Sequence, residues 1–410
     1  MNIRYITVIT IILTLLIGCG KKEDDTVIKS ISTNNKIESS VSYNVNNVQK
    51  ITPTLKPVPT PVSKNNISKN EICITLTPTS IPTITPTPTI APTPIPEIRL
   101  SDNVKYDIII DTDYASDSDD VAALKVGIML DKLGETKLKA VVTSAEGDYV
   151  CRAAHGQLSY EGYNTLPVGM ARRGVEDWGP YWDIFVSKLN DQATYQLIDG
   201  VELYRNILRE ANINNTKIRI IVLGFMVNIQ DILMDEECYS LIESNVDSIW
   251  IDGGAYPMTG KDFNFYWTPE CIESIQYAIA NSPVPLVFIT NETGCNYETG
   301  VCVTCGSNLK QLDPDITEPV NIAYRAFEDE YGANLDGGHM AWDAITVWSA
   351  VKTRDESMTK LTPIDAYVYE DGTNEFIINP NGKHYILERE NYNVNWYSQQ
   401  LDSLIKINMQ

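Results

Sequence analysis

The chain has 410 residues, of which 43% are hydrophobic, so it can bury the core of at least one full-sized domain. Residues 1–98 hold nine Lys or Arg and six Asp or Glu, which leaves 23 basic and 48 acidic residues, a formal charge of −25, for residues 99–410. Because a surface this negative repels phosphate backbones, the composition argues against nucleic-acid partners and suits a cation site or a neutral substrate.

The first nineteen residues are typical of an export signal. One Arg precedes an apolar run over residues 5–18, which is shorter than the roughly 18 to 20 residues of a membrane-spanning helix. The run ends in Leu16-Ile17-Gly18-Cys19, which resembles the lipobox of bacterial lipoproteins, where the Cys is lipidated and becomes the new N-terminus. We therefore expect a signal peptide over residues 1–19 and a lipid anchor on Cys19 that holds the chain at the extracellular side of the cell membrane. A simple cleaved secretion signal is the alternative.

Residues 20–98 are rich in Asn, Ser, Thr and Pro and culminate in a run of alternating Thr and Pro. Such a composition cannot bury enough apolar surface to offset the loss of chain entropy on folding. Alternating Thr-Pro favours extended polyproline II segments. We therefore expect a disordered, semi-rigid linker here, followed by a single folded domain over residues 99–410.

Short apolar runs at 106–111, 138–144, 166–171, 218–224, 248–254 and 285–290 read as strands. Helical stretches are expected between them, after Asp120 and at 152–162, 201–211 and 269–280. Strands that are apolar on both faces and alternate with helices predict an α/β fold with a mainly parallel open sheet flanked by helices, Rossmann-like in its core. The segment 364–410 reads as short strands and a terminal helix, a small β-rich extension packed against the main sheet.

In an open parallel sheet the ligand site lies at the carboxyl ends of the strands. Four predicted strands end in unusual residues: five aspartates within 111–120, then Ser144 to Asp148, Gly224 to Asn228, and the glycine pair at 253–254. We expect these four ends to converge.

The aspartates of that first strand end are Asp111, Asp113, Asp117, Asp119 and Asp120. Uncompensated, five carboxylates would repel one another, whereas a divalent cation could neutralise several of them, and hard oxygen ligands select calcium or magnesium. The alternative is an acidic surface loop that caps the following helix and binds nothing, but capping needs one carboxylate rather than five.

Removing Cys19 leaves seven cysteines and no evident disulfide framework. The Cys302-x-x-Cys305 spacing fits a redox pair, half of a zinc site or a short-loop disulfide, and a single such motif is weak evidence for zinc. We favour a local disulfide near Cys295.

The aspartate cluster resembles the N-terminal signature of the inosine-uridine-preferring nucleoside hydrolase family, in a variant with two extra residues in the loop. Further matches follow in the family's order and span residues 106–351. They are VVTSAEGD at 141–148, LGFMVN at 223–228, DGGA at 252–255 with Asp262-x-Asn264 and Thr268-Pro269-Glu270, and Trp342-Asp343-Ala344.

This resemblance implies a calcium-dependent hydrolase that cleaves the N-glycosidic bond of a ribonucleoside with water activated by the metal, and in this family the fold often assembles as dimers or tetramers. Carried onto this chain, the calcium ligands are Asp113, Asp120, the Val227 carbonyl and Asp343, with Asp113 also the general base. The side chains implied to contact the substrate are Asp119, Asp148, Asp262, Asn264, His339 and Trp342.

One departure from the family pattern bears on activity. Many members carry a histidine directly before the last metal-binding Asp, and Trp342 stands there in this chain. His339 could substitute as the acid that assists the leaving base, although an exposed loop histidine is the more common meaning of a lone His. Trp178, Tyr181 and Trp182 could stack on a base or sugar, or simply be core.

The expected function is therefore release of a base from a ribonucleoside or related glycoside outside the cell. Two alternatives stay open. One is a lipoprotein on the same fold that binds a sugar or nucleoside without turning it over. The other is a hydrolase of a different glycoside.

Overall fold

The computed structural model describes residues 105–114, 117–176, 197–296, 300–307, 309, 317–352, 359–389 and 394–406. The predicted signal peptide, Cys19, the linker and the aromatic segment at 178–182 lie outside these ranges. Among the helices that can be described, none is long and apolar enough to cross a membrane.

A single large sheet organises the domain, with the strand order β4-β3-β2-β1-β5-β6-β8-β15-β13-β14-β7. Neighbouring strands are parallel from β4 as far as β15 and antiparallel beyond it. The strands of the sheet are β1 (Asp107–Thr112), β2 (Lys137–Ala145), β3 (Val168–Val175), β4 (Ile198–Asp199), β5 (Ile218–Val222), β6 (Val246–Asp252), β7 (Gly260–Lys261), β8 (Leu286–Ile289), β13 (Thr359–Val368), β14 (Thr373–Ile378) and β15 (His384–Arg389).

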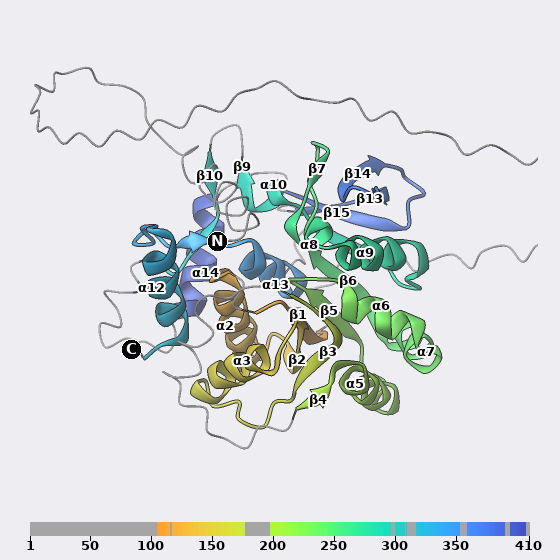
Figure 1. The fold of residues 1–410 in the computed structure, drawn as a ribbon, viewed down its shortest axis with the longest axis horizontal. Helices are drawn as coiled ribbons and strands as arrows, with labels where there is room; N and C mark the ends of the chain where they lie inside the picture. Colours follow the sequence, from red (N-terminus) through yellow and green to blue (C-terminus); the bar gives the residue numbers. More distant parts are fainter. Residues whose placement is uncertain are drawn as a thin grey trace, which may run out of the picture. The chain divides into compact units, whose positions relative to one another are not determined.

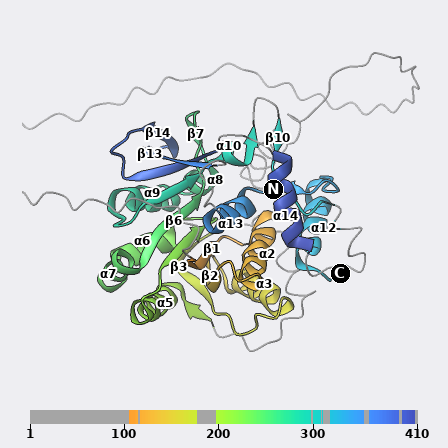
Figure 2. The same cartoon turned by 180° about the vertical axis from the view of Figure 1, so that it is seen from behind.

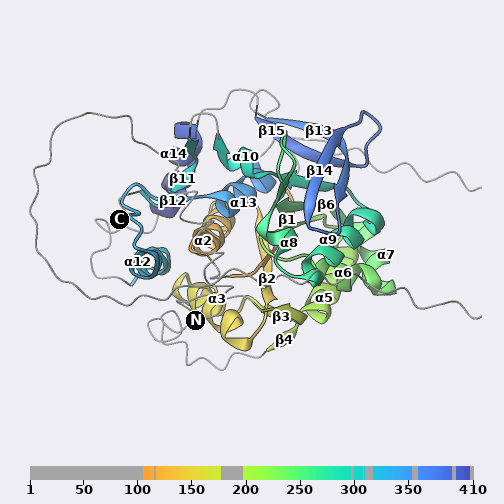
Figure 3. The same ribbon diagram turned by 45° about the horizontal axis from the view of Figure 1, so that its top comes forward.

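Helices cover both faces of the sheet, as Figure 3 shows with the sheet turned toward its edge. One layer holds α2 (Asp119–Lys132), α3 (Asp148–Tyr160), α12 (Pro319–Tyr331), α13 (Trp342–Lys352) and α14 (Val394–Ile405). The other holds α5 (Gly200–Asn214), α6 (Val227–Met234), α7 (Glu236–Asn245) and α9 (Pro269–Asn281). The same two layers are visible from the front and from behind (Figures 1 and 2).

Strand β1 shows why the sequence requires two helix layers. Successive side chains of a strand point to opposite faces, and all three isoleucines of β1 are fully buried. Ile108 and Ile110 pack into the core under α2 and α13, whereas Ile109 packs into the core under α5 and α6. A strand that is apolar on both faces must be covered on both, and this confirms the predicted fold class.

The C-terminal extension belongs to the main sheet itself. As predicted, it consists of strands followed by a helix, α14. Strand β15 pairs in parallel with β8, and β13 and β14 continue the sheet through antiparallel hairpins to β7. The extension therefore lengthens the sheet beyond the parallel core.

Several short elements complete the described fold. They are α8 (Phe263–Tyr266), which precedes α9, and then α10 (Asn291–Gly294), β9 (Cys295–Asn296), β10 (Val301–Cys302), β11 (Thr304–Cys305) and β12 (His339–Met340). A disulfide joins Cys295 to Cys302 across the β9–β10 pair, which confirms the expected local bridge. Cys305 is a buried free thiol, so the two cysteines of the CxxC motif do not pair with each other.

Candidate metal centre and active site

Asp111, at the carboxyl end of β1, anchors the aspartate loop. The Tyr204 hydroxyl donates to its Oδ2 at 2.7 Å, and the Asn228 amide donates to its Oδ1 at 3.1 Å. Asn228 also donates to the Thr143 carbonyl at 3.2 Å, so one side chain joins the ends of β1 and β2 to α6. Burial raises the pKa of Asp111 to about 7 despite these donors. Asp111 thus ties the start of the aspartate loop to α5 and α6.

The acidic group consists of Asp119, Asp120 and Asp343, whose ligand oxygens lie within 4.8 Å of one another. Asp119 and Asp120 begin α2, and Asp343 lies in the first turn of α13. All three are buried, and the Asp343 backbone N–H donates to Asp119 Oδ2 at 3.3 Å. Residues 224 positions apart in the sequence are thereby brought together, as the resemblance implied for Asp120 and Asp343.

Electrostatics make this group unfavourable without a cation. Desolvation, followed by repulsion from neighbouring carboxylates, raises the pKa of all three side chains well above the ordinary aspartate value. The Thr112 hydroxyl donates to Asp120, but no Lys or Arg forms an ion pair with the acidic group within the described ranges. Buried charges need a partner or a metal, so the donor set fits a hard divalent cation.

Asp113 is buried beside the loop that follows β5. A Cβ on Gly224 would lie 2.7 Å from the Asp113 carboxylate, so only glycine lets the loop approach this closely. Among the neighbouring charges, Asp113 raises the pKa of Asp120 the most. Asp113 therefore lies next to the acidic group. Val227, three residues after Gly224, is buried and begins α6, and metal ligation by its carbonyl stays a prediction.

Asp262 and Asn264 hold the ends of β5 and β6 together. The Asn264 amide donates to the Leu223 carbonyl at 2.8 Å and to the Asp252 carbonyl at 3.2 Å. Its backbone N–H donates to Asp262 Oδ1 at 3.0 Å, and burial raises the pKa of Asp262 to about 6. Both residues lie at the predicted edge of the sheet, and their contact with a sugar stays a prediction.

Asp252, at the end of β6, is a further member of this edge that was not singled out from the sequence. Its Oδ1 accepts from the Thr346 hydroxyl of α13 at 3.2 Å. Desolvation and the neighbouring carboxylates, Asp262 above all, raise its pKa well above the ordinary value. The signal available in the sequence was its place directly before Gly253-Gly254, at a predicted strand end.

Two predicted substrate residues make other contacts. Asp148 is exposed, with 52% of its side chain accessible, and pairs with Arg152 one helical turn later at 2.8 Å. Trp342, at the start of α13, donates from its indole to the Asn291 carbonyl at 3.3 Å and packs so closely on Gly294 that a Cβ there would lie 2.2 Å from the ring. Neither belongs to the groups that could hold a metal.

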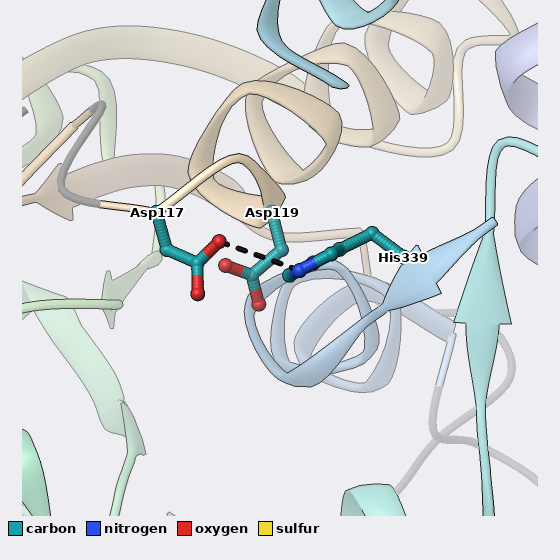
Figure 4. A group of neighbouring side chains, drawn as sticks. All are labelled: Asp117, Asp119 and His339. Atoms are coloured by element: carbon teal, nitrogen blue, oxygen red, sulfur yellow. Dashed lines mark ion pairs between the residues drawn. The ribbon is translucent and has the colours of Figure 1, made fainter. Parts of the chain in front are cut away.

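His339 is only 4% exposed, so the alternative of an exposed loop histidine is wrong. Its Nε2 lies 3.6 Å from Asp117 Oδ1, and both residues converge with Asp119 (Figure 4). Asp117 had no role that could be assigned from the sequence, because the pairing depends on a strand more than two hundred residues away.

No protein-family model matches the sequence, and no curated protein matches it either. Solved structures do match the fold. A plant nucleoside hydrolase is 16% identical, with a TM-score of 0.52 over 74% of this chain and 99% of its own. The inosine-uridine-preferring nucleoside hydrolase of Bacillus anthracis is 13% identical, with a TM-score of 0.51 over 74% and 100% of the two chains. An inosine-guanosine nucleoside hydrolase is 14% identical, with a TM-score of 0.55 over 74% and 99%.

These likenesses establish the fold of residues 105–406 as nucleoside-hydrolase-like: a large, mainly parallel sheet flanked by helices. A fold hosts many functions, so the activity has to be argued from the side chains at the carboxyl end of the sheet.

Proposed function

We propose that the chain is a calcium-dependent hydrolase of the N-glycosidic bond of a ribonucleoside. The observation that carries the proposal is the acidic group: Asp119, Asp120 and Asp343 are buried, lie within 4.8 Å of one another, and stand at the end of the sheet where ligands bind in this class of fold. The likeness in fold to nucleoside hydrolases supports the choice of an N-glycoside.

Asp120, Asp343 and the Val227 carbonyl would hold the cation together with Asp113. A bound Ca²⁺ supplies positive charge that makes a water in its coordination shell more acidic. Asp113 would accept the proton of the attacking water as general base, and its burial beside the acidic group supports this role. Cleavage passes through an oxocarbenium-like state, and Asp113 and Asp119 would stabilise its positive charge.

The test is incubation of the purified full-length chain with a panel of ribonucleosides, with Ca²⁺ or with a chelator, and measurement of free ribose. We expect release that needs Ca²⁺ and falls by about 10²–10⁴-fold in Asp113→Asn, the usual contribution of a general base. Asp329→Asn, an exposed aspartate of α12, is the matched control and should keep full activity. Ribose release that ignores the chelator would contradict the mechanism.

A non-catalytic binding protein on the same fold is the second candidate. The observation that favours it is Trp342, whose indole donates to a backbone carbonyl and offers no acidic proton to a leaving base. Calcium-dependent nucleoside binding without release of ribose from any member of the panel would favour this candidate.

We further propose that the chain is anchored by lipid on Cys19 at the extracellular side of the membrane. The lipobox-like sequence supports this location, and so does the Cys295–Cys302 disulfide, because disulfides persist mainly in oxidising compartments. In detergent phase partitioning, the wild-type chain should enter the detergent phase and Cys19→Ala should not. Equal partitioning of the two would rule out the anchor.

A further inference from the structure

A second set of metal-ligating side chains lies beside the acidic group. The His339 group consists of Asp117, Asp119 and His339, whose donor atoms all lie within 4.8 Å of one another. Figure 4 shows the two carboxylates, from the segment that opens α2, facing the imidazole from β12. Asp119 belongs to both groups, and His339 to this one alone.

The His339 ring is held in one orientation and one tautomer. Its Nδ1 lies 3.0 Å from the Met340 carbonyl oxygen, and because a carbonyl only accepts, Nδ1 must carry the proton. The ring packs against Phe327 and Tyr324, with centroid separations of 4.7 and 5.8 Å, and β12 pairs with β11. A backbone carbonyl on the far nitrogen is the usual support of a metal-ligating histidine.

In the neutral ring, the Nε2 atom presents a lone pair to the carboxylates. The 3.6 Å separation from Asp117 Oδ1 is too long for a hydrogen bond. Two electron-rich atoms that face each other in a partly buried site need either a proton on Nε2 or a metal ion between them. A histidine nitrogen and a carboxylate oxygen, each about 2.1 Å from one Zn²⁺, lie about 3.4 Å apart at the tetrahedral angle, close to what the structure has.

We propose that Asp117, Asp119 and His339 form a second metal site, for a first-row transition-metal dication of the Zn²⁺ class. An imidazole ligand favours such an ion over Ca²⁺, which takes oxygen ligands, so the two sites would differ in the metal they select. Asp119, which belongs to both groups, would be a ligand of this second ion and would lie beside the calcium ligands Asp120 and Asp343.

The charge at this end of the sheet supports two cations rather than one. The acidic group, Asp113 and Asp117 together carry five carboxylates when ionised, and one dication compensates two of them. Of these carboxylates, Asp117 and Asp119 are the ones grouped with His339. A second dication there would leave the ionised centre close to neutral.

The test titrates Zn²⁺ alone into the full-length chain saturated with Ca²⁺, using a chromogenic chelator as competitor and elemental analysis of both metals after dialysis. We expect one equivalent of Zn²⁺ to bind while Ca²⁺ is retained. Because second-sphere partners alone are worth about 10–100-fold in metal affinity, loss of a ligand in His339→Gln or Asp117→Asn should weaken Zn²⁺ binding more than 100-fold. The matched control is His155→Gln, a buried histidine of α3 outside both groups, and it should bind Zn²⁺ like the wild type.

Three results would overturn the proposal: no Zn²⁺ bound by the Ca²⁺-saturated wild type, binding unchanged in His339→Gln and Asp117→Asn, or Zn²⁺ that enters only by displacing Ca²⁺. The first would leave a proton, rather than a metal, between His339 and Asp117. Should His339→Gln fail to fold, Asp117→Asn decides, since that side chain is 36% exposed. Because the experiment measures metal content, its result tests the second metal site independently of ribose release.

Discussion

Replacing Asp343 by Asn is expected to stabilise the metal-free protein and to abolish its stabilisation by Ca²⁺. The side-chain oxygen of Asp343 lies within 4.8 Å of those of Asp119 and Asp120. Two unit charges at that distance repel each other by about 3.5 kcal/mol at an effective dielectric constant of about 20. Partial protonation relieves some of this repulsion, because the pKa of each group is raised. We therefore expect a net gain of about 1–3 kcal/mol in the metal-free variant.

The calcium-loaded proteins should rank in the opposite order. Ca²⁺ at about 100 times its Kd stabilises the wild type by about 2.7 kcal/mol, whereas the variant lacks a ligand and gains nothing. Thermal unfolding in chelator and in Ca²⁺ measures both effects, at roughly 2–4 °C per kcal/mol for a domain of this size. Asp329→Asn, exposed on α12, is the control and should behave as the wild type in both conditions.

The same experiment has a predicted pH dependence. The pKa values of these carboxyl groups are higher in the folded state than in the unfolded state. Such groups stabilise the folded protein at low pH, and this stability is lost as the pH rises from the unfolded-state pKa through the folded-state pKa. Metal-free wild type should therefore lose stability with rising pH above about 4, and Asp343→Asn should lose less. An Asp343→Asn protein that is less stable than the wild type in chelator, or that is still stabilised by Ca²⁺, would refute the reasoning.

Three further predictions concern stability. Burial lowers the pKa of His384 to about 4. The contribution of its neutral ring to the free energy of unfolding, about 3 kcal/mol, is therefore present above pH 6.5 and lost as the pH falls toward 4. His384→Gln should remove this dependence from the pH profile of unfolding. The double variant Cys295→Ser, Cys302→Ser should cost about 2 kcal/mol, the entropy of a loop of this length, and should make the melting temperature insensitive to reductant. Lys125→Met removes the buried cation that Glu161 and Glu318 share and should cost about 3–5 kcal/mol in denaturant unfolding. Because Glu161 keeps Lys132 and Glu318 does not, adding Glu161→Gln should recover only part of this cost.

The sheet core and the aspartate loop could be predicted from the sequence because their signals are local. Five aspartates directly after the apolar run of β1 fix both the strand end and the acidic character of the site. The helices α6, α7 and α12 were not assigned, although each of them carries apolar positions at helical spacing. The place of β15 beside β8 depends on a pairing almost a hundred residues apart, which no local pattern encodes.

Asp148 illustrates how a local interaction can compete with a family pattern. It ends the motif at 141–148, which follows a predicted strand in the family's order, and the resemblance implies that it contacts the sugar. The sequence also puts Arg152 four residues later, and on a helix that spacing favours an ion pair, which the structure forms at 2.8 Å. Gly147, with φ of +110°, turns the chain into α3 just before it.

The long-range contacts of the site explain both what the sequence conceals and why the fold accepts so much buried charge. Asp343 and His339 come from elements more than two hundred residues after the aspartate loop, and only the packing of α13 on α2 and the β11–β12 pair bring them to it. A core that merely needed to be stable would place apolar residues there, since burying like charges is costly. Apolar packing around the site, including the buried isoleucines of β1 and most of α2, supplies the free energy that holds these carboxylates together. The proposed cations would therefore complete a site that the fold builds at a cost, which is why removing one carboxylate should stabilise the metal-free protein and disable it at the same time.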